Sequence, residues 1–450
     1  MARTLIKSGT VVTMDEHVPD LPRGDVLVED GRIAGIAAAI DAADAEIIDA
    51  AQCIVMPGLV NAHLHTWQTA LRGVAADWTI AHYLHAMHAA IAPGFLPADI
   101  FVSTLVGALN QLNSGVTTLV DWCHNNPTPA HTDAGIDALV DSGIRAVFLH
   151  GSPKPDAKPG RKHFSQTPHP RAEIERLAMG RLAARDGLVT LGMAILGPAY
   201  STYEVSRHDV ALARELSLIC SMHVGGGAML TPDGFSRLVA EGLIDERVNI
   251  VHGNNLADAQ LRSLIDSGAG VTVTPEAELQ MGFGDCLTGR LRALKAAPSL
   301  GSDVESSLGS DMFTTMRMAL QTQRNLDSQT IVARTGKVPE RISVTCREAL
   351  GWATIAGARM LGVDDRIGSL APGKQADIVL LNADDLNLLP VVDPVHSIVL
   401  HAGIANVDTV MVAGRVMKRY GKLHYGELAR RKAELVQCSR RILGNAGLIH

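Results

Sequence analysis

The chain has 450 residues, a net charge of −7 and a composition that is 47% hydrophobic and 19% charged. That length allows a large core and more than one domain. A mildly acidic chain without a basic run argues against binding to nucleic acid or to an anionic membrane surface. No stretch is long and apolar enough to span a membrane, and the N-terminus lacks the apolar core of a signal peptide. The six cysteines are widely spaced and form no C-x-x-C pair, which predicts reduced thiols and a cytoplasmic location.

The two ends of the chain carry short strand patterns separated by turns. Residues 1–57 include "EDGRI" at 29–33, residues 365–425 include "VAGRV" at 412–416, and both motifs are typical of hairpin turns. We therefore predict one small β domain assembled from both ends, with the intervening residues 58–364 forming a separate domain. Residues 426–450 are predicted to form a C-terminal helix and tail.

Between the two ends, short apolar runs alternate with longer segments. The runs occupy residues 58–65, 116–122, 144–151, 188–196, 218–224, 248–253, 269–275 and 298–303. Most of the segments between them have apolar residues at helical spacing and end in glycine, as many helices do. A strand followed by a helix, repeated eight times, predicts an α/β fold with a parallel (β/α)8 barrel of the TIM type.

Side chains that bind metals stand at four of the eight predicted strand ends. His63 and His65 leave the first strand two residues apart, so they point to the same side. His223, His252 and Asp303 end the fifth, sixth and eighth strands. Because the active site of such a barrel lies at the C-terminal ends of its strands, these side chains are expected to converge. Imidazole and carboxylate groups in that arrangement predict a metal site.

Several longer motifs resemble the amidohydrolase superfamily. More narrowly, they resemble its cytosine-deaminase-like branch, which includes adenosylhomocysteine and guanine deaminases and the triazine hydrolases. The motifs include "MPGLVNAHLH" (56–65), "NSGVTTLVD" (113–121), "VHGNNL" (251–256) and "GSLAPGKQADIVLLN" (368–382). The resemblance covers nearly the whole chain. It implies a distorted (β/α)8 barrel with a small β-sandwich built from both termini, in agreement with the pattern above.

Carried over residue by residue, the resemblance implies that His63, His65, His223 and Asp303 are the ligands of one divalent metal. Three neutral imidazoles and one carboxylate suit zinc, with iron(II) as the alternative. Some members of the superfamily bridge two metals with a carboxylated lysine from the fourth strand. Residues 188–196 contain no lysine, so we expect one metal per chain.

The resemblance also implies how these groups take part in a reaction. His252 would act on the metal-bound water or on the forming oxyanion, and Asp303 would take the proton of that water. A second "GSD" motif offers Asp311 as a competing carboxylate. Asp303 is preferred, because it ends the eighth apolar run.

The chain departs from the family pattern at two places. Deaminases of the family carry Glu three residues after the fifth-strand histidine to move a proton to the substrate, whereas this chain has Gly226, which opens space there. Beyond Pro275, at the end of the seventh strand, stand Glu276 and Glu278. Glu276 is nearer to the strand end, so we predict that it replaces the proton shuttle or binds a cationic group of the substrate. The alternative is that both are solvated loop charges.

Three further residues near the first and second strand ends are candidates for contact with the substrate. Gln68 is in an H-x-H-x-x-Q pattern like that of the triazine hydrolases, and an amide there can bond to a polar substrate. Trp67 and Trp122 offer aromatic walls for a planar substrate, and the alternative is that each is an ordinary core residue.

The predicted function is a single-metal hydrolase acting on carbon–nitrogen bonds other than peptide bonds. Metal-bound hydroxide would release ammonia or an amine from a small heterocyclic or aromatic substrate. One alternative is hydrolysis of an amide, urea or carbamate, or removal of a halide, none of which depends as much on the missing Glu. Another is a barrel without catalysis that serves as a binding protein. We expect a small-molecule substrate and a homo-oligomer, a dimer or larger.

Overall fold

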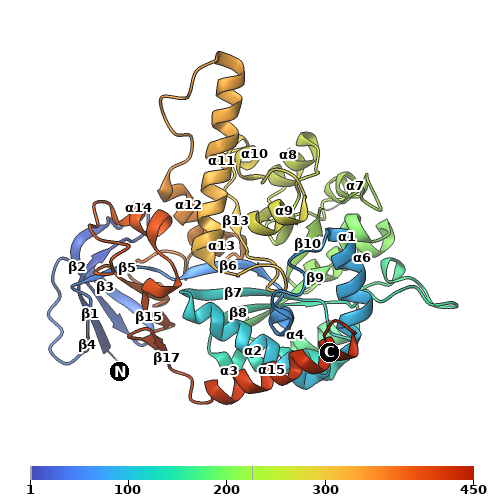
Figure 1. Cartoon of the computed structure of the whole chain (residues 1–450), viewed down its shortest axis with the longest axis horizontal. Coiled ribbons are helices and arrows are strands. Elements are labelled where there is room, and N and C mark those ends of the chain that lie inside the picture. The colour runs from blue at the N-terminus through green and yellow to red at the C-terminus, as the bar shows by residue number, and fades with distance from the viewer. Residues whose placement is uncertain (1–2, 226, 450) are drawn as a thin grey trace. The chain divides into compact units, whose positions relative to one another are not determined.

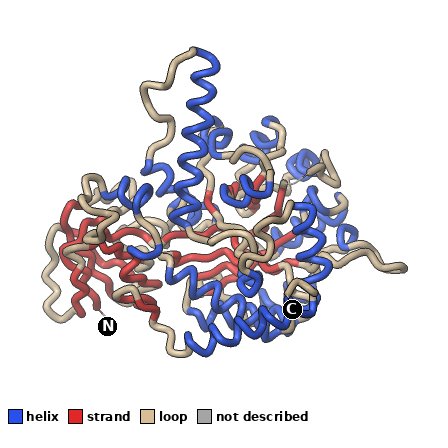
Figure 2. The backbone as a smooth tube through the Cα atoms, in the orientation of Figure 1, coloured by secondary structure: helices blue, strands red, loops and turns tan. Residues whose placement is uncertain are grey.

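The computed structural model describes residues 3–225 and 227–449, and its helices and strands are drawn in Figures 1 and 2. The chain divides into two compact units. The first comprises residues 1–61, 109–118 and 311–425, and the second comprises residues 62–108, 119–310 and 426–450. These units differ from the predicted segments, because residues 311–364 fall in the first unit and the C-terminal helix falls in the second.

A mixed sheet of nine strands is built from both ends of the chain. Its N-terminal strands are β1 (Arg3–Val11), β2 (Leu21–Glu29), β3 (Arg32–Ala37), β4 (Glu46–Asp49) and β5 (Cys53–Pro57). Its C-terminal strands are β14 (Ile378–Asn382), β15 (Val407–Val412), β16 (Arg415–Arg419) and β17 (Lys422–Leu423). The order is β17-β16-β15-β14-β5-β1-β2-β3, with β4 on β1, so the antiparallel pair of β14 and β5 joins the two halves. The predicted β structure assembled from both ends of the chain is confirmed.

The two predicted hairpin turns lie against each other. Asp30 and Gly31 between β2 and β3, and Ala413 and Gly414 between β15 and β16, all have positive φ, as a type I′ turn requires. A Cβ on Gly414 would lie 2.5 Å from the Cα of Gly31. This close approach leaves no room for a side chain, which explains the second glycine.

Eight parallel strands follow one another in chain order around the barrel. They are β6 (Leu59–Leu64), β7 (Val116–Cys123), β8 (Arg145–Gly151), β9 (Val189–Ile195), β10 (Ile219–Val224), β11 (Val248–His252), β12 (Gly270–Val273) and β13 (Ser299–Leu300). Each overlaps one of the eight apolar runs, so the predicted α/β barrel is confirmed. Nearly all of their side chains are buried, because a parallel barrel is covered on both faces.

Helices connect the barrel strands (Figure 2). The longer ones are α2 (Pro97–Asn113), α3 (Pro129–Ser142), α4 (Arg171–Met179), α6 (Tyr203–Glu215) and α8 (Asp258–Asp266). The shorter ones are η1 (Thr66–Leu71), α1 (Ile80–His85), η2 (Ala86–Ile91), η3 (Ala92–Gly94), η4 (Phe164–Gln166), α5 (Gly197–Tyr200), α7 (Gly234–Ala240), α9 (Pro275–Met281) and α10 (Thr288–Ala293). α3 shows how the sequence sets such bounds, since Pro stands at its start and Gly143 ends it with φ of 73°.

The remaining helices follow the barrel. They are α11 (Met312–Thr335), α12 (Cys346–Trp352), α13 (Ile355–Met360), α14 (Pro394–His396), η5 (Ser397–His401), η6 (Ile404–Asn406) and α15 (Leu428–Asn445). Asp311 caps α11 by accepting a hydrogen bond from the N–H of Phe313 at 3.0 Å. Among the described residues no single helix is long and apolar enough to cross a membrane, although segments 80–94 and 97–113, bent by 117°, pass that test as a pair.

Candidate metal centre

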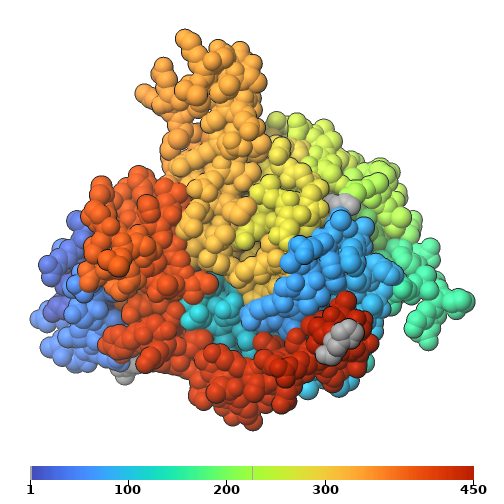
Figure 3. Space-filling view, viewed as in Figure 1, coloured from blue at the N-terminus to red at the C-terminus, as the bar shows by residue number. Residues whose placement is uncertain are grey.

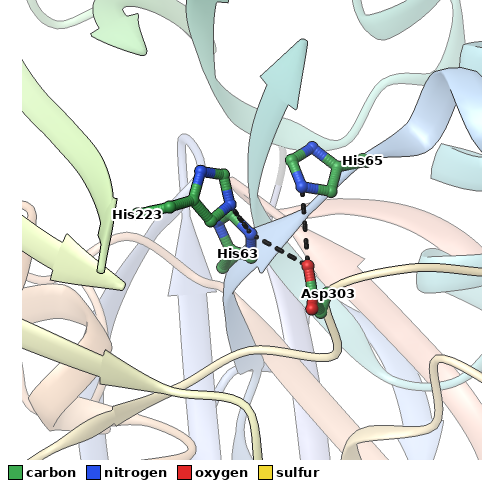
Figure 4. Close-up of side chains that lie close together, drawn as sticks. All are labelled: His63, His65, His223 and Asp303. Carbon is green, nitrogen blue, oxygen red and sulfur yellow. Dashed lines mark hydrogen bonds and ion pairs between the residues drawn. The ribbon is translucent and has the colours of Figure 1, made fainter. Parts of the chain in front are cut away.

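The four side chains predicted to bind a metal converge at the C-terminal ends of the strands (Figure 4). His63 and His65 come from the end of β6, His223 from β10, and Asp303 from just beyond β13. One possible ligand atom from each residue lies within 4.8 Å of all the others. The Nε2 atom of His63 is 3.2 Å from Oδ1 of Asp303 and 3.1 Å from Nε2 of His223. The Nε2 atom of His65 is 3.5 Å from the same carboxylate oxygen.

The backbone places these residues where the first and last barrel strands meet. The N–H groups of Ser302 and Asp303 donate to the carbonyl of His63 at 3.1 and 3.0 Å, and the N–H of His65 donates to the carbonyl of Asp303 at 2.9 Å. Gly301 allows this approach, because a Cβ there would lie 2.6 Å from the Cβ of His63. Asp303 itself has φ of 63°, an uncommon conformation for a residue with a side chain. The contacts that close the barrel therefore also set the geometry of the cluster.

Burial keeps the histidines of the cluster neutral. It lowers the pKa of His65 to about 3 and holds the pKa values of His63 and His223 below the ordinary value. The Nδ1 atom of His65 lies 2.5 Å from the carbonyl oxygen of Trp122, so Nδ1 carries the proton. Its Nε2 atom therefore offers a lone pair to the cluster, which is how a backbone carbonyl orients a metal-binding histidine.

Asp303 supplies the negative charge of the cluster. Burial acts to raise the pKa of its carboxyl group, but the hydrogen bond with His63 and the nearby His252 outweigh it and hold the pKa below its ordinary value. Neutral imidazoles and an ionised carboxylate with converging lone pairs are the donor set of a zinc site. The residues present therefore fit a divalent metal.

His252 lies beside the cluster and is held by a buried glutamate. Its Nε2 atom is 3.9 Å from Oδ2 of Asp303, while its Nδ1 atom is 3.0 Å from Oγ1 of Thr274 and 3.5 Å from Oε1 of Glu278. Glu278 is fully buried, and its carboxylate accepts hydrogen bonds from the N–H of Thr274 at 2.8 Å and from Asn254 at 3.2 Å. These contacts orient the imidazole so that Nε2 faces Asp303.

The glutamate predicted from the sequence and the one beside His252 are different residues. Both Glu276 and Glu278 lie on α9, and Glu278 contacts His252. Glu276 is half-buried and is not one of the residues that line the pocket at the cluster. Its predicted role therefore stays a prediction. Gly226, which was expected to open space beside the metal, lies outside the described residues.

The three residues predicted to contact the substrate lie one layer behind the pocket. Gln68 is fully buried, donates a hydrogen bond to the hydroxyl of Tyr83 at 2.6 Å and accepts one from Ser306 at 2.7 Å. Trp67 is also buried and donates to Nδ1 of His124 at 2.9 Å. The side chain of Trp122 is buried against His223, and its carbonyl oxygen contacts His65. Each residue therefore supports a side chain that does line the pocket.

The pocket at the cluster has a volume of about 40 Å³. It is lined by His65, His223, His252 and Asp303, and also by residues for which the sequence suggested no role. Those residues include Tyr83, His88, His124, Lys154, Tyr200 and Phe283. His124 stands one residue beyond the end of β7, and its place near a strand end is visible in the sequence. The others come from connecting segments, whose course the apolar pattern does not predict.

The chain is similar to known proteins over most of its length. The model of the amidohydrolase family matches residues 54–417. The 8-oxoguanine deaminase of Pseudomonas aeruginosa is 32% identical over 420 residues, covering 87% of this chain and 88% of that protein. A zinc-bound adenosine deaminase from Xanthomonas campestris has 25% identity and a TM-score of 0.82, covering 98% of this chain and 99% of that one.

A further solved structure shares the fold at lower identity. The atrazine chlorohydrolase TrzN from Arthrobacter aurescens, complexed with zinc, has a TM-score of 0.86 and 21% identity, covering 97% of this chain and 100% of that one. The family match covers most of the chain. This chain belongs to the amidohydrolase family.

Proposed function

We propose that this chain is a metal-dependent hydrolase that breaks a C–N bond in a small nitrogen heterocycle or aromatic amine and releases ammonia or an amine. The observation that carries the proposal is the convergence of His63, His65, His223 and Asp303 at a pocket lined by aromatic and imidazole side chains. Relatives that deaminate 8-oxoguanine and adenosine support it. We assign these four residues as the ligands of one metal, with zinc preferred to iron(II).

When bound, such a metal would lower the pKa of a water molecule towards ~7 and so make a nucleophile available at neutral pH. We assign the carboxylate of Asp303 to receive a proton in this reaction. Its Oδ1 atom faces His63 and His65, whereas its Oδ2 atom faces His252 at 3.9 Å. One oxygen therefore stays with the ligands while the other is available to hold a proton.

His252 is assigned to stabilise the negative charge that forms when the substrate carbon becomes tetrahedral. Its Nδ1 atom is engaged by Thr274 and Glu278, so its Nε2 atom is directed to the same side as Asp303. A fixed donor aimed at developing charge contributes more than a mobile one, because it needs no reorganisation during the reaction. Glu278 is in this view a positioning residue, since it acts through His252.

A deamination also needs a group that donates a proton to the departing nitrogen. The sequence has Gly226 where related deaminases have a glutamate, and glycine cannot transfer a proton. Glu276 stays a candidate from the sequence for this role. The same glycine favours a second candidate function, the release of a group that leaves without a proton, such as a halide.

The decisive experiment combines metal analysis with a leaving-group assay. We expect the purified protein to contain about one zinc or iron per chain, and expect it to release ammonia or an amine from members of a panel of aminated heterocycles. Chloride release from the matching chlorinated heterocycles tests the second candidate. His63→Ala should abolish metal and activity together, and activity that persists without the metal would contradict the proposal. Glu276→Gln with lower turnover and unchanged metal would establish the carboxylate as the proton donor.

We also propose that the protein works in the cytoplasm as a homo-oligomer. All six cysteines are free, which is consistent with a reducing compartment. Light scattering of the purified protein would test for a dimer or a larger assembly.

A further inference from the structure

A second cavity adjoins the pocket at the metal cluster. Its volume is about 610 Å³, and it shares His88, His124 and Lys154 with the smaller pocket. Three more cationic side chains line it, those of Lys158, Arg161 and Lys162. No aspartate or glutamate is among its lining residues in the described part of the chain. Several cations without an acid give a cavity a positive potential, which favours an anionic ligand.

Lys154 occupies the junction of the two cavities. Its Nζ atom lies 5.7 Å from the ring centroid of Trp122 and 5.2 Å from that of Tyr200, within the range of cation–π attraction. No carboxylate of the described residues pairs with this half-buried ammonium group. Burial lowers the pKa of Lys154 only to about 8, so the group stays mostly charged at neutral pH. A half-buried charge held by aromatic faces alone gains most from a ligand that brings the opposite charge.

The other three cations form the outer wall of the cavity. They lie on the segment after β8, which extends outward at the right-hand edge in Figures 1 and 3, and residues 155–162 are exposed. The described residues offer no ion-pair partner to Lys158, Arg161 or Lys162. Asp156 belongs to the same segment but does not line this cavity. Exposed cations contribute less than Lys154 to the affinity for an anion, because water and salt screen them.

We propose that the substrate is a heterocycle with an anionic substituent, a carboxylate or a phosphate, and that this substituent binds in the second cavity with Lys154 as its principal contact. The identity of the reacting ring rests on the proposed function, whereas the anion site does not. The ring would lie towards the metal cluster, and the substituent would lie among the cations. Lys154 is then a specificity-determining residue that selects substrates by charge.

Direct binding to the zinc-loaded protein, measured by isothermal titration calorimetry, tests the proposal without requiring turnover. Two matched pairs of probes differ in charge, nicotinate against nicotinamide and adenosine 5′-monophosphate against adenosine. We expect the anionic member of at least one pair to bind about tenfold tighter or more, the size of one charge-assisted hydrogen bond. A preference within the first pair only identifies a carboxylate site, and within the second pair only a phosphate site. Lys154→Met should abolish the preference, and Lys154→Arg, which keeps the charge, should retain part of it.

Two controls separate the site from other causes of anion binding. Lys337→Met removes the same charge from an exposed residue outside both cavities and should leave the preference unchanged. Metal-free protein should keep the preference, because the anion binds to Lys154 and not to the metal. The proposal is wrong if neither pair shows a preference, if Lys154→Met retains it, or if it disappears with the metal. A preference that depends on Lys154 in a protein with no hydrolase activity would refute the proposed function and leave the anion site standing.

Discussion

Gly301→Ala tests whether the junction between β6 and β13 fixes the metal site. The added Cβ would lie 2.6 Å from the Cβ of His63 and 2.9 Å from its backbone nitrogen and oxygen. Ordinary contacts of a Cβ begin at 3.4 Å, so the two segments must separate by about 0.8 Å, the difference between 3.4 and 2.6 Å. Ligand distances in metal sites tolerate only about 0.2 Å. We therefore expect metal affinity to fall by about 10- to 100-fold, as when the support of a ligand is lost.

The assay is competition with a chelator, read as metal content per chain, together with chemical denaturation. Overpacking of this kind should also lower the free energy of unfolding by about 1–3 kcal/mol. Gly309→Ala is the matched control, because it adds the same methyl group beyond β13 at a position where a Cβ meets nothing within 4 Å. A folded Gly301→Ala protein with the metal affinity of the wild type would refute the reasoning that this junction sets the position of His63.

Three further substitutions have expected outcomes. His223→Ala should reduce the metal, measured by mass spectrometry, to well below one equivalent per chain, because three ligands no longer close the site. Glu278→Gln should keep the metal and lower turnover by about 10- to 10³-fold. The carboxylate of Glu278 lies 3.5 Å from His252, and at an effective dielectric constant of ~20 it stabilises a protonated His252 by at most about 5 kcal/mol. Unchanged turnover would show that Glu278 has no part in the mechanism. Lys418 is buried, and burial lowers its pKa to about 8, whereas the pKa of a lysine in an unfolded chain is about 10.4. Between pH 8 and about 10.4 the unfolded state therefore binds more protons than the folded state. The free energy of unfolding should therefore rise with pH across this window, and Lys418→Met should flatten the rise in denaturation curves.

The sequence was sufficient to predict the barrel and the cluster, because both follow from local patterns combined with one topological rule. Each apolar run needs only its own residues to be recognised as a strand. The rule that barrel strands present their C-terminal ends together then brings His63, His65, His223 and Asp303 to one place. Asp311, the competing carboxylate, caps α11 in the structure.

Glu276 was preferred to Glu278 because it is nearer to the strand end along the chain. The structure has a helix there, with Thr274 before it and Pro275 at its first position, which is a helix-start signal present in the sequence. Residues 274 and 278 are then one helical turn apart, so Glu278 reaches back to the N–H of Thr274 and to His252. The carboxylate found beside His252 is therefore the one that lies further along the chain from the strand end.

The layer behind the pocket could not be predicted from nearness to a strand end. Gln68 and Trp67 follow His65 closely along the chain, yet each is turned inward and bonded to a second side chain. Contacts with segments that are distant in sequence decide which residues face the pocket. One such contact is the hydrogen bond that Ser306 donates to Gln68. Lys154 lines the pocket from a connecting segment. The periodicity of apolar residues predicts helices and strands, but it does not predict the course of a connecting segment.

The meeting of β6 with β13 also bears on how the protein assembles. His63 and Asp303 are separated by 240 residues, so joining them closes a long loop and carries a large entropic cost. Little regular pairing offsets that cost, because β13 has two residues and the bridge to β6 is the single pair of Leu64 with Asp303. An ion bound by both of these residues would act as a cross-link between distant parts of the chain. Amide hydrogens of His65 and Asp303 should therefore exchange with solvent much faster in the metal-free protein than those of central strands such as β9. We therefore expect closure of this long loop to depend on the ion that His63 and Asp303 are proposed to bind.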